Sequence, residues 1–149
     1  MVPELRAERL QEIARRVLNE FGGNLWRALS GPVKDVRKRL KSFPGIADPG
    51  VDRILLFAGI SPVAAVPSNC VHVLYRIQHG PEGSSYAATY REAQKTIERE
   101  VPKNLESRTR AYLLLKLHGQ ELCKRTNPRC QACVLRRDCS FASAAAPSA

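Results

Sequence analysis

The sequence predicts an all-α fold, and three observations lead to this prediction. Apolar residues recur at the three- and four-residue spacing of a helix face through most of the chain. No segment shows the alternation of polar and apolar residues that a half-buried strand requires. Hydrophobic residues make up 44% of the 149 positions and are spread along the chain, which is a globular composition. We expect one compact unit, although this length also suits two small lobes.

The first half of the chain predicts three helices and a short segment. The first helix has Pro3 near its start and a glycine pair at 22–23 as its stop. A short segment around 25–29 follows, a second helix opens after Gly31 and Pro32, and a third runs over 51–58. The residues expected to face inward are Leu10, Ile13, Ala14, Val17, Leu18, Phe21, Val33, Val36 and Leu40.

The second half predicts three more helices. Ser68 is a plausible N-cap for the first of them, and the others cover 86–101 and 107–122, with a loop at 80–85. The residues expected to face inward are Val71, Leu74, Ile77, Tyr90, Ala93, Ile97, Val101, Ala111, Leu114, Leu115 and His118. We found no internal repeat.

The charge of the chain limits the classes of partner. There are 24 Lys and Arg residues against 14 Asp and Glu, a net charge of +10, which suits a polyanionic partner without identifying it. No apolar run approaches the roughly 18 to 20 residues of a membrane helix, and the first residues lack the hydrophobic region of a signal peptide. We therefore expect a cytoplasmic protein with no membrane partner.

Four of the five cysteines lie close together near the end of the chain, namely Cys123, Cys130, Cys133 and Cys139. A secreted disulfide framework would spread its cysteines through the whole chain, so a metal or cluster site is favoured here. A 4Fe-4S cluster and a four-thiolate zinc site both suit these ligands, and four unliganded thiols are the third alternative. The spacing alone leaves the metal open. Cys70, outside this group, is expected to be a small buried residue.

The segment 43–50, Phe-Pro-Gly-Ile-Ala-Asp-Pro-Gly, is rich in helix breakers and separates two predicted helices. This pattern predicts a helix-hairpin-helix element at about 33–58. A glycine-containing turn at a helix N-terminus exposes backbone N–H groups that can hold a phosphate without reading a base. The alternatives are an ordinary corner between helices and, for the basic helix before it, a solvated charged face. The candidate phosphate contacts here are Pro44, Gly45, Ala47, Lys38 and Lys41.

Both motifs resemble those of the endonuclease III and adenine-glycosylase group of DNA repair proteins. The resemblance covers roughly residues 5–141 and is specific at the cysteine loop, over 117–123 and 128–139, and at the hairpin, whose usual form is Leu-Pro-Gly-Val-Gly. It implies a glycosylase-like fold, a 4Fe-4S cluster on the four cysteines, double-stranded DNA as the partner and a role in base-excision repair. It also implies that the loop, with Arg125 and Arg129, docks on the DNA backbone. The alternative is that these basic residues only compensate the negative charge of the cluster and its thiolates.

The chain departs from this family at two catalytic positions. Bifunctional members have a lysine in the hairpin that forms a Schiff base, and this chain has Pro49 at that position. Both bifunctional and monofunctional members have an aspartate at the start of the next helix, and this chain has Pro67 there. Asp48 and Asp52 are expected to cap the helix rather than to replace these groups. The resemblance also makes Asn69 and His72 candidate contacts to DNA or to a base, because the helix they begin lines the family's active site. The alternative for each is an ordinary residue of the helix surface.

Three functions therefore remain open. The first is an iron–sulfur DNA-binding protein without the family's catalytic groups, the second an active glycosylase or AP lyase with relocated groups, and the third an iron–sulfur module that does not bind DNA. We expect a helical region at 1–122, a cluster loop at 123–139 and a low-complexity tail at 140–149 that frays. The family's six-helix lobe begins upstream of Met1. From this resemblance we expect a fragment of a longer protein, a shortened relative, or a chain that relies on a protein partner for the missing part of the lobe.

Overall fold

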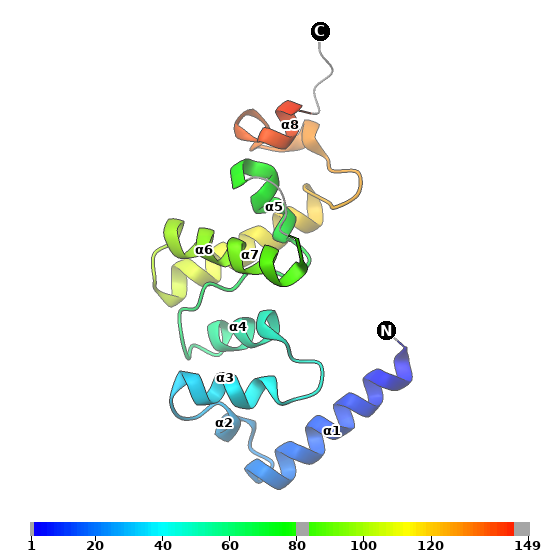
Figure 1. Ribbon diagram of the computed structural model, residues 1–149, viewed down its shortest axis with the longest axis vertical. Coiled ribbons are helices and arrows are strands. Elements are labelled where there is room, and N and C mark those ends of the chain that lie inside the picture. The colour runs from blue at the N-terminus through cyan, green and yellow to red at the C-terminus, as the bar shows by residue number, and fades with distance from the viewer. Residues whose placement is uncertain (1, 80–83, 145–149) are drawn as a thin grey trace. The chain divides into compact units, whose positions relative to one another are not determined.

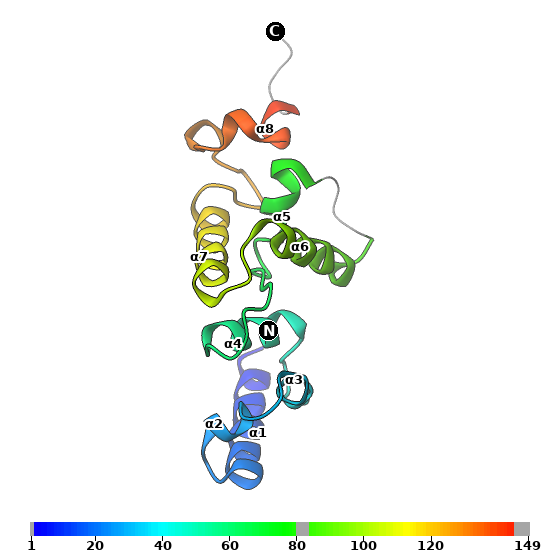
Figure 2. The ribbon, with the colours of Figure 1, turned by 90° about the vertical axis from the view of Figure 1, so that its left-hand side faces the viewer.

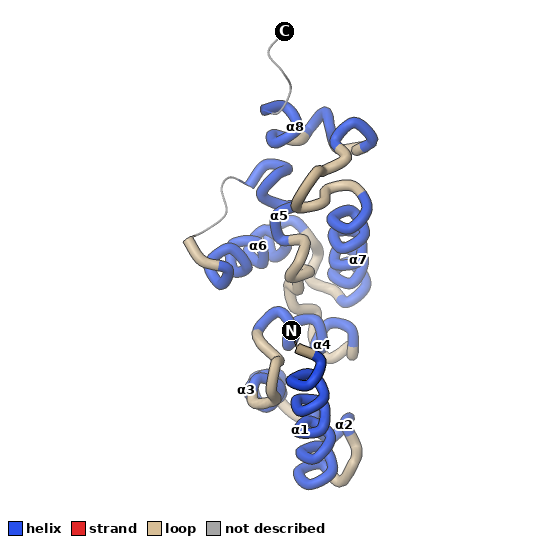
Figure 3. Tube along the Cα trace, turned by 90° about the vertical axis from the view of Figure 1, so that its right-hand side faces the viewer, coloured by secondary structure: helices blue, strands red, loops and turns tan. Residues whose placement is uncertain are grey.

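The computed structural model describes residues 2–79 and 84–144, and all regular secondary structure in these ranges is helical (Figure 3). This confirms the predicted all-α class. The chain divides into two compact units, Met1–Ser61 and Pro62–Ala149. None of the described helices is long and apolar enough to cross a membrane.

Unit 1 contains α1 (Pro3–Phe21), α2 (Leu25–Ala28), α3 (Val33–Lys41) and α4 (Asp48–Phe57), shown in blue to teal in Figure 1. The predicted start and stop of α1 are confirmed, with Pro3 in its first turn and Gly22 as a left-handed C-cap at φ 60°. By contrast, α4 begins three residues before the predicted Val51. Pro49 fits its first turn because the N–H that proline lacks would have no partner within the helix there.

The core of unit 1 lies between α3 and α4. Val36 and Leu40 of α3 are buried as predicted, while Val33 is 37% exposed. Arg39 of α3 is half-buried and donates to the carbonyl oxygens of Ala28 and Ser30 at 2.7 and 3.1 Å. The other buried apolar residues of this unit are Ala28, Phe43, Val51, Leu55 and Leu56.

The predicted inner face of α1 is only partly covered. Leu10 and Leu18 are 67% and 65% exposed, and no residue of α1 is fully buried. The prediction was wrong for these two leucines because the neighbouring elements of unit 1 cover a different edge of the helix. In α2, Leu25 and Trp26 are likewise 55% and 66% exposed.

Unit 2 is built around α5 (Val71–Leu74), which continues directly as one π-helical turn (Tyr75–His79), and around α6 (Tyr86–Glu100) and α7 (Leu105–Glu121). Figure 2 shows α6 and α7 beside this central segment. The described part of the unit ends with two 3-10 turns, Cys130–Ala132 and Arg136–Asp138, and with α8 (Ser140–Ala144). The core cluster consists of Ala64, Val66, Val71, Leu74, Tyr90, Ala93 and Ile97.

The predicted inner faces of α5 and α6 are therefore confirmed, but two details are wrong. Ser68 does not cap α5, because the helix begins at Val71 after Cys70 and no side chain caps it. Leu114 of α7 is 56% exposed, since α7 presents a different edge to α5. That contact is close at Gly119, where an added Cβ would lie 2.6 Å from the Cys70 sulfur.

Two other expectations concern the ends of unit 2. Residues 80–83 of the predicted loop at 80–85 lie outside the described residues. The first five residues of the expected tail form α8, and residues 145–149 also lie outside the described part.

Candidate functional site

The hairpin joins α3 to α4 in unit 1. Gly45 has a φ of 81°, a left-handed conformation that favours glycine, and both Gly45 and Ala47 are exposed while Pro44 is half-buried. Ala47 precedes α4 with a φ of −101°, which any residue adopts, so alanine fits where the family has a second glycine. No side chain accepts a hydrogen bond at this helix start. The turn thus leaves the backbone of the α4 N-terminus accessible to an anion.

Two carboxylates tie the hairpin helices together. Arg37 of α3 lies 2.6 Å from Asp52 Oδ1 of α4, and Asp52 is 1% exposed. Lys41 Nζ lies 2.9 Å from Asp48 Oδ1. Instead of capping alone, both aspartates are ion-pair partners of α3, and Lys41, a predicted DNA contact, already has one carboxylate neighbour. Lys38, the other predicted lysine, is exposed.

The two prolines that the resemblance sets at the family's catalytic positions, Pro49 and Pro67, are in ordinary structural settings. Pro49 lies half-buried in the first turn of α4. Pro67 is buried before α5, and its carbonyl oxygen accepts the N–H of Cys70 at 2.9 Å. Neither side chain has an amine or a carboxylate.

The structure separates the two polar candidates of the following segment. Asn69 is exposed, whereas His72 is 3% exposed and donates from Nε2 to the carbonyl oxygen of Cys123 at 2.7 Å. Both alternatives for His72, a contact to DNA or a base and an ordinary place on the helix surface, disagree with this burial, because its imidazole holds the start of the cysteine loop. The sequence places these residues 51 positions apart and gives no signal of the contact.

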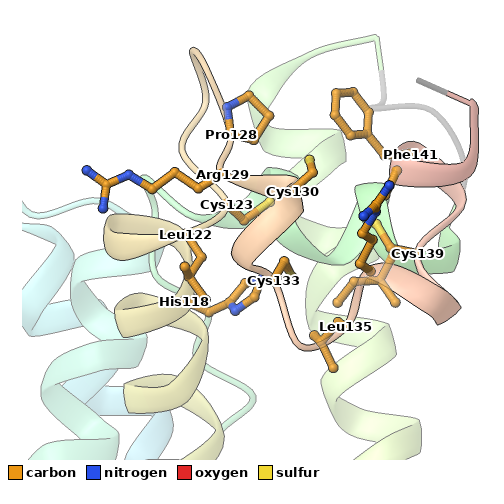
Figure 4. Close-up of a pocket in the computed structure, with 13 residues that line it drawn as sticks. His118, Leu122, Cys123, Pro128, Arg129, Cys130, Cys133, Leu135, Cys139 and Phe141 are labelled. Atoms are coloured by element: carbon orange, nitrogen blue, oxygen red, sulfur yellow. Dashed lines mark hydrogen bonds between the residues drawn. The ribbon is translucent and has the colours of Figure 1, made fainter. Parts of the chain in front are cut away.

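The four cysteines of the loop line one pocket, as Figure 4 shows, and Cys139 is the most buried of them. Cys123 Sγ lies 3.6 Å from Arg76 Nη1, and Cys133 Sγ lies 3.8 Å from His118 Nε2. Burial lowers the pKa of His118 and so favours its neutral form. The pocket wall also includes Ile77, Leu122, Pro128, Leu135 and Phe141.

The fit of a metal to this pocket rests on the donor set. Over residues 2–79 and 84–144, no three His, Cys, Asp or Glu side chains form a group that could hold a metal ion. The four cysteines thus share a pocket without being arranged as ligands. Four thiols are nevertheless the soft donors that a 4Fe-4S cluster or a zinc ion requires.

Arg76 was not predicted, and it contacts the loop most extensively. From the π-helical turn it donates to the carbonyl oxygens of Lys124 at 2.7 Å and of Arg125 at 2.8 Å. Its guanidinium lies 4.5 Å from the centre of the Phe141 ring. Arg125 and Arg129, the predicted DNA contacts of the loop, are both exposed. The backbone that presents Arg125 is therefore held by a residue 49 positions earlier.

Comparisons with known proteins agree with this architecture. No family model matches the chain. Over 136 residues it is 24% identical to Endonuclease III of Thermotoga maritima, and the match covers 91% of this chain and 57% of that protein.

Two solved structures are similar in fold. One is a trapped endonuclease III–DNA covalent intermediate in an estranged-adenine complex, with a TM-score of 0.69, 21% identity, and coverage of 93% of this chain and 58% of that chain. The other is a thermostable thymine-DNA glycosylase, with a TM-score of 0.67, 26% identity, and coverage of 94% and 59%. The helix-hairpin-helix glycosylase-like fold is thus confirmed. The chain spans less than two thirds of the length of each of these proteins.

Proposed function

We propose that this chain, which is endonuclease III-like in sequence and fold, binds double-stranded DNA in base-excision repair and holds a 4Fe-4S cluster on its four loop cysteines. The observation that carries the proposal is the exposed hairpin, with a left-handed Gly45 and an uncapped α4 N-terminus. Its backbone N–H groups and the positive end of the helix dipole favour a phosphate. Contacts of this kind position a duplex and carry no sequence information.

Salt dependence tests the DNA-binding part. Each phosphate contact adds about 0.9 to the slope of log affinity against log salt for duplex DNA, so we expect a slope of several units. Lys38→Gln should lower it by about 0.9 if this exposed lysine of α3 contacts a phosphate. Lys103→Gln, an equal charge change at an exposed site in unit 2, is the control. An affinity that stays the same between low and moderate salt would contradict the proposal.

The proposed DNA binding is non-catalytic. Pro49 and Pro67 offer neither an amine for a Schiff base nor a carboxylate, and Asp48 and Asp52 are engaged with Lys41 and Arg37. We expect no covalent adduct on borohydride treatment of abasic duplexes and no strand nicking. Adducts or turnover would instead establish the rival function, a glycosylase or AP lyase with relocated groups.

The proposed cluster is supported by four thiols that line one pocket. Arg76 and His118, whose neutral form is favoured by burial, lie beside two of these thiols. When bound, the cluster would crosslink the loop 123–139 and fix the exposed Arg125 and Arg129. Anaerobic purification with iron, sulfide and zinc analysis tests it. We expect about four iron and four sulfide per chain, both lost in Cys130→Ser; one zinc without sulfide would remove the cluster from the proposal. The other alternative function is an iron–sulfur module that does not bind DNA, and the exposed hairpin is the feature that disfavours it.

A protein partner completes the proposal. The chain matches 57% of the length of the Thermotoga maritima protein, and Leu10, Leu18, Leu25 and Trp26 are exposed in unit 1. We infer that a partner polypeptide with an apolar helical face covers these residues.

A further inference from the structure

Two arginines of α1, outside the hairpin motif, lie against the hairpin. Arg16 donates from Nη1 to the carbonyl oxygen of Ser42 at 2.6 Å and from Nη2 to the Ser42 hydroxyl at 2.9 Å. Its guanidinium also lies 4.5 Å from the centre of the Phe43 ring. Figure 1 shows the resulting arrangement, with α1 running beside the connection from α3 to α4. Arg16 therefore fixes which face of α1 is turned to the hairpin.

Arg9 lies seven residues before Arg16, which places it about 10.5 Å away on the same face of the helix. A Cβ atom added to Gly45 would lie 3.6 Å from Arg9 Nη1 and 3.7 Å from Arg9 Cδ. The half-buried Arg9 side chain is thus next to the exposed turn glycine. Its guanidinium therefore lies beside the hairpin turn.

The charges already present at the hairpin explain why the position of Arg9 matters. Lys41 and Arg37 of α3 each have a carboxylate of α4 as a neighbour, which reduces the positive field that α3 contributes to the turn. An arginine next to the turn adds a planar group with several donors, a geometry that matches phosphate oxygens.

We propose that Arg9 is a further phosphate-binding residue, which contacts the DNA backbone at the hairpin turn together with the N–H groups of α4. This proposal rests on the proposed DNA binding. The competing explanation is that Arg9 only packs on Gly45 and shields it.

The first test compares salt slopes on a duplex for the wild-type chain and three variants. Arg9→Gln should lower the slope by about 0.9, while Arg9→Lys, which keeps the charge, should restore it. Arg15→Gln is the matched control, because Arg15 is on the same helix, is 63% exposed and pairs with Glu12. An Arg9→Gln slope equal to that of the wild type would overturn the role of Arg9. Salt-independent binding by the wild type would overturn the proposed function itself.

A second test uses the unaltered chain, so it does not depend on how a variant folds. Phenylglyoxal modifies accessible guanidiniums, and peptide mass analysis with and without duplex DNA reports the protection of each arginine. We expect DNA to slow the modification of Arg9 at least several-fold and to leave Arg15 unchanged. Equal rates at Arg9 with and without bound DNA would show that its role is packing.

Discussion

Arg37 on α3 and Asp52 on α4 form an ion pair at 2.6 Å in which the carboxylate is buried and the arginine reaches solvent. The side chain of Arg37 is 34% exposed, against 1% for Asp52. The pair joins the two helices of the hairpin, so it determines how rigidly the turn between them is held. Because only the carboxylate is buried, we expect the two partners to contribute unequally to stability.

Loss of Arg37 should therefore cost more stability than loss of Asp52. Arg37→Met removes the ion-pair partner of a buried carboxylate, which costs about 3 kcal/mol. Asp52→Asn leaves an arginine that can rehydrate, so we expect about 1 kcal/mol. Urea unfolding of the full chain measures both free energies, and Lys38→Met, at an exposed position of α3, should change little. Equal costs for the two variants would show that the burial difference has no energetic role.

Gly119→Ala should destabilise unit 2. The new Cβ would lie 2.6 Å from Cys70 Sγ and 2.8 Å from Cys70 Cβ, so α7 and α5 must move apart at a cost of about 1 to 3 kcal/mol. Cys70→Ala in the same chain removes only the sulfur contact, so we expect a partial rescue in thermal unfolding. Gly50→Ala is the control, because its Cβ would lie 3.5 Å from Ile46 in ordinary contact. A Gly119→Ala variant as stable as the wild type would contradict this close packing.

Cysteine alkylation should distinguish Cys70 from the loop cysteines. Cys70 is 2% exposed, and burial raises the pKa of its thiol, so little reactive thiolate is present near pH 8. In the metal-free protein, iodoacetamide should label the half-buried Cys123, Cys130 and Cys133 at least ten times faster than Cys70, as read by peptide mass analysis. Labelling of Cys70 at the rate of the loop cysteines would show that the α5–α7 contact opens readily.

Arg76→Met should loosen the start of the cysteine loop. The substitution removes the hydrogen bonds to the carbonyl oxygens of Lys124 and Arg125 and the contact with Phe141. Cleavage after Lys124 by a lysine-specific protease should become several-fold faster, because local opening limits this cleavage. Arg110→Met, at an exposed position of α7, is the control. Unchanged cleavage would mean that the Arg76 side chain does not hold this part of the loop.

Trp26 provides a direct signal of partner binding, because it is the single tryptophan of the chain and is 66% exposed. The isolated chain should emit as a solvent-exposed indole at all concentrations, and a partner that covers unit 1 should shift the emission to the blue. Analytical ultracentrifugation of the same samples provides the control. A blue shift that accompanies dimer formation by the chain alone would show that a second copy of the chain, and not another polypeptide, covers Trp26.

Local patterns predicted the helices well because capping and periodicity act over a few residues. Pro3 and the glycine pair correctly bounded α1, and Tyr90, Ala93 and Ile97 correctly marked the inner face of α6. The same periodicity did not predict that Leu10 and Leu18 are exposed. Periodicity identifies an apolar face, but whether that face is covered depends on the elements that pack against it.

The candidate site was predictable only where its chemistry is clustered in sequence. The four cysteines and the hairpin could be found because their residues are close neighbours in the chain. Arg76 and Arg16 could not, because they act on backbone atoms 49 and 26 positions away. Arginine is also common on helix surfaces of a chain with 24 basic residues, so its type alone carries no signal.

The seven-residue interval between Arg9 and Arg16 also restricts how α1 can change. Each residue turns the helix by about 100°, so deleting one residue between the two arginines would rotate Arg9 away from Gly45 while Arg16 kept its hold on Ser42. Substitutions of the residues between the two arginines do not change the angle between Arg9 and Arg16 about the helix axis. We therefore expect that this stretch of α1 accepts many side chains but no change of length.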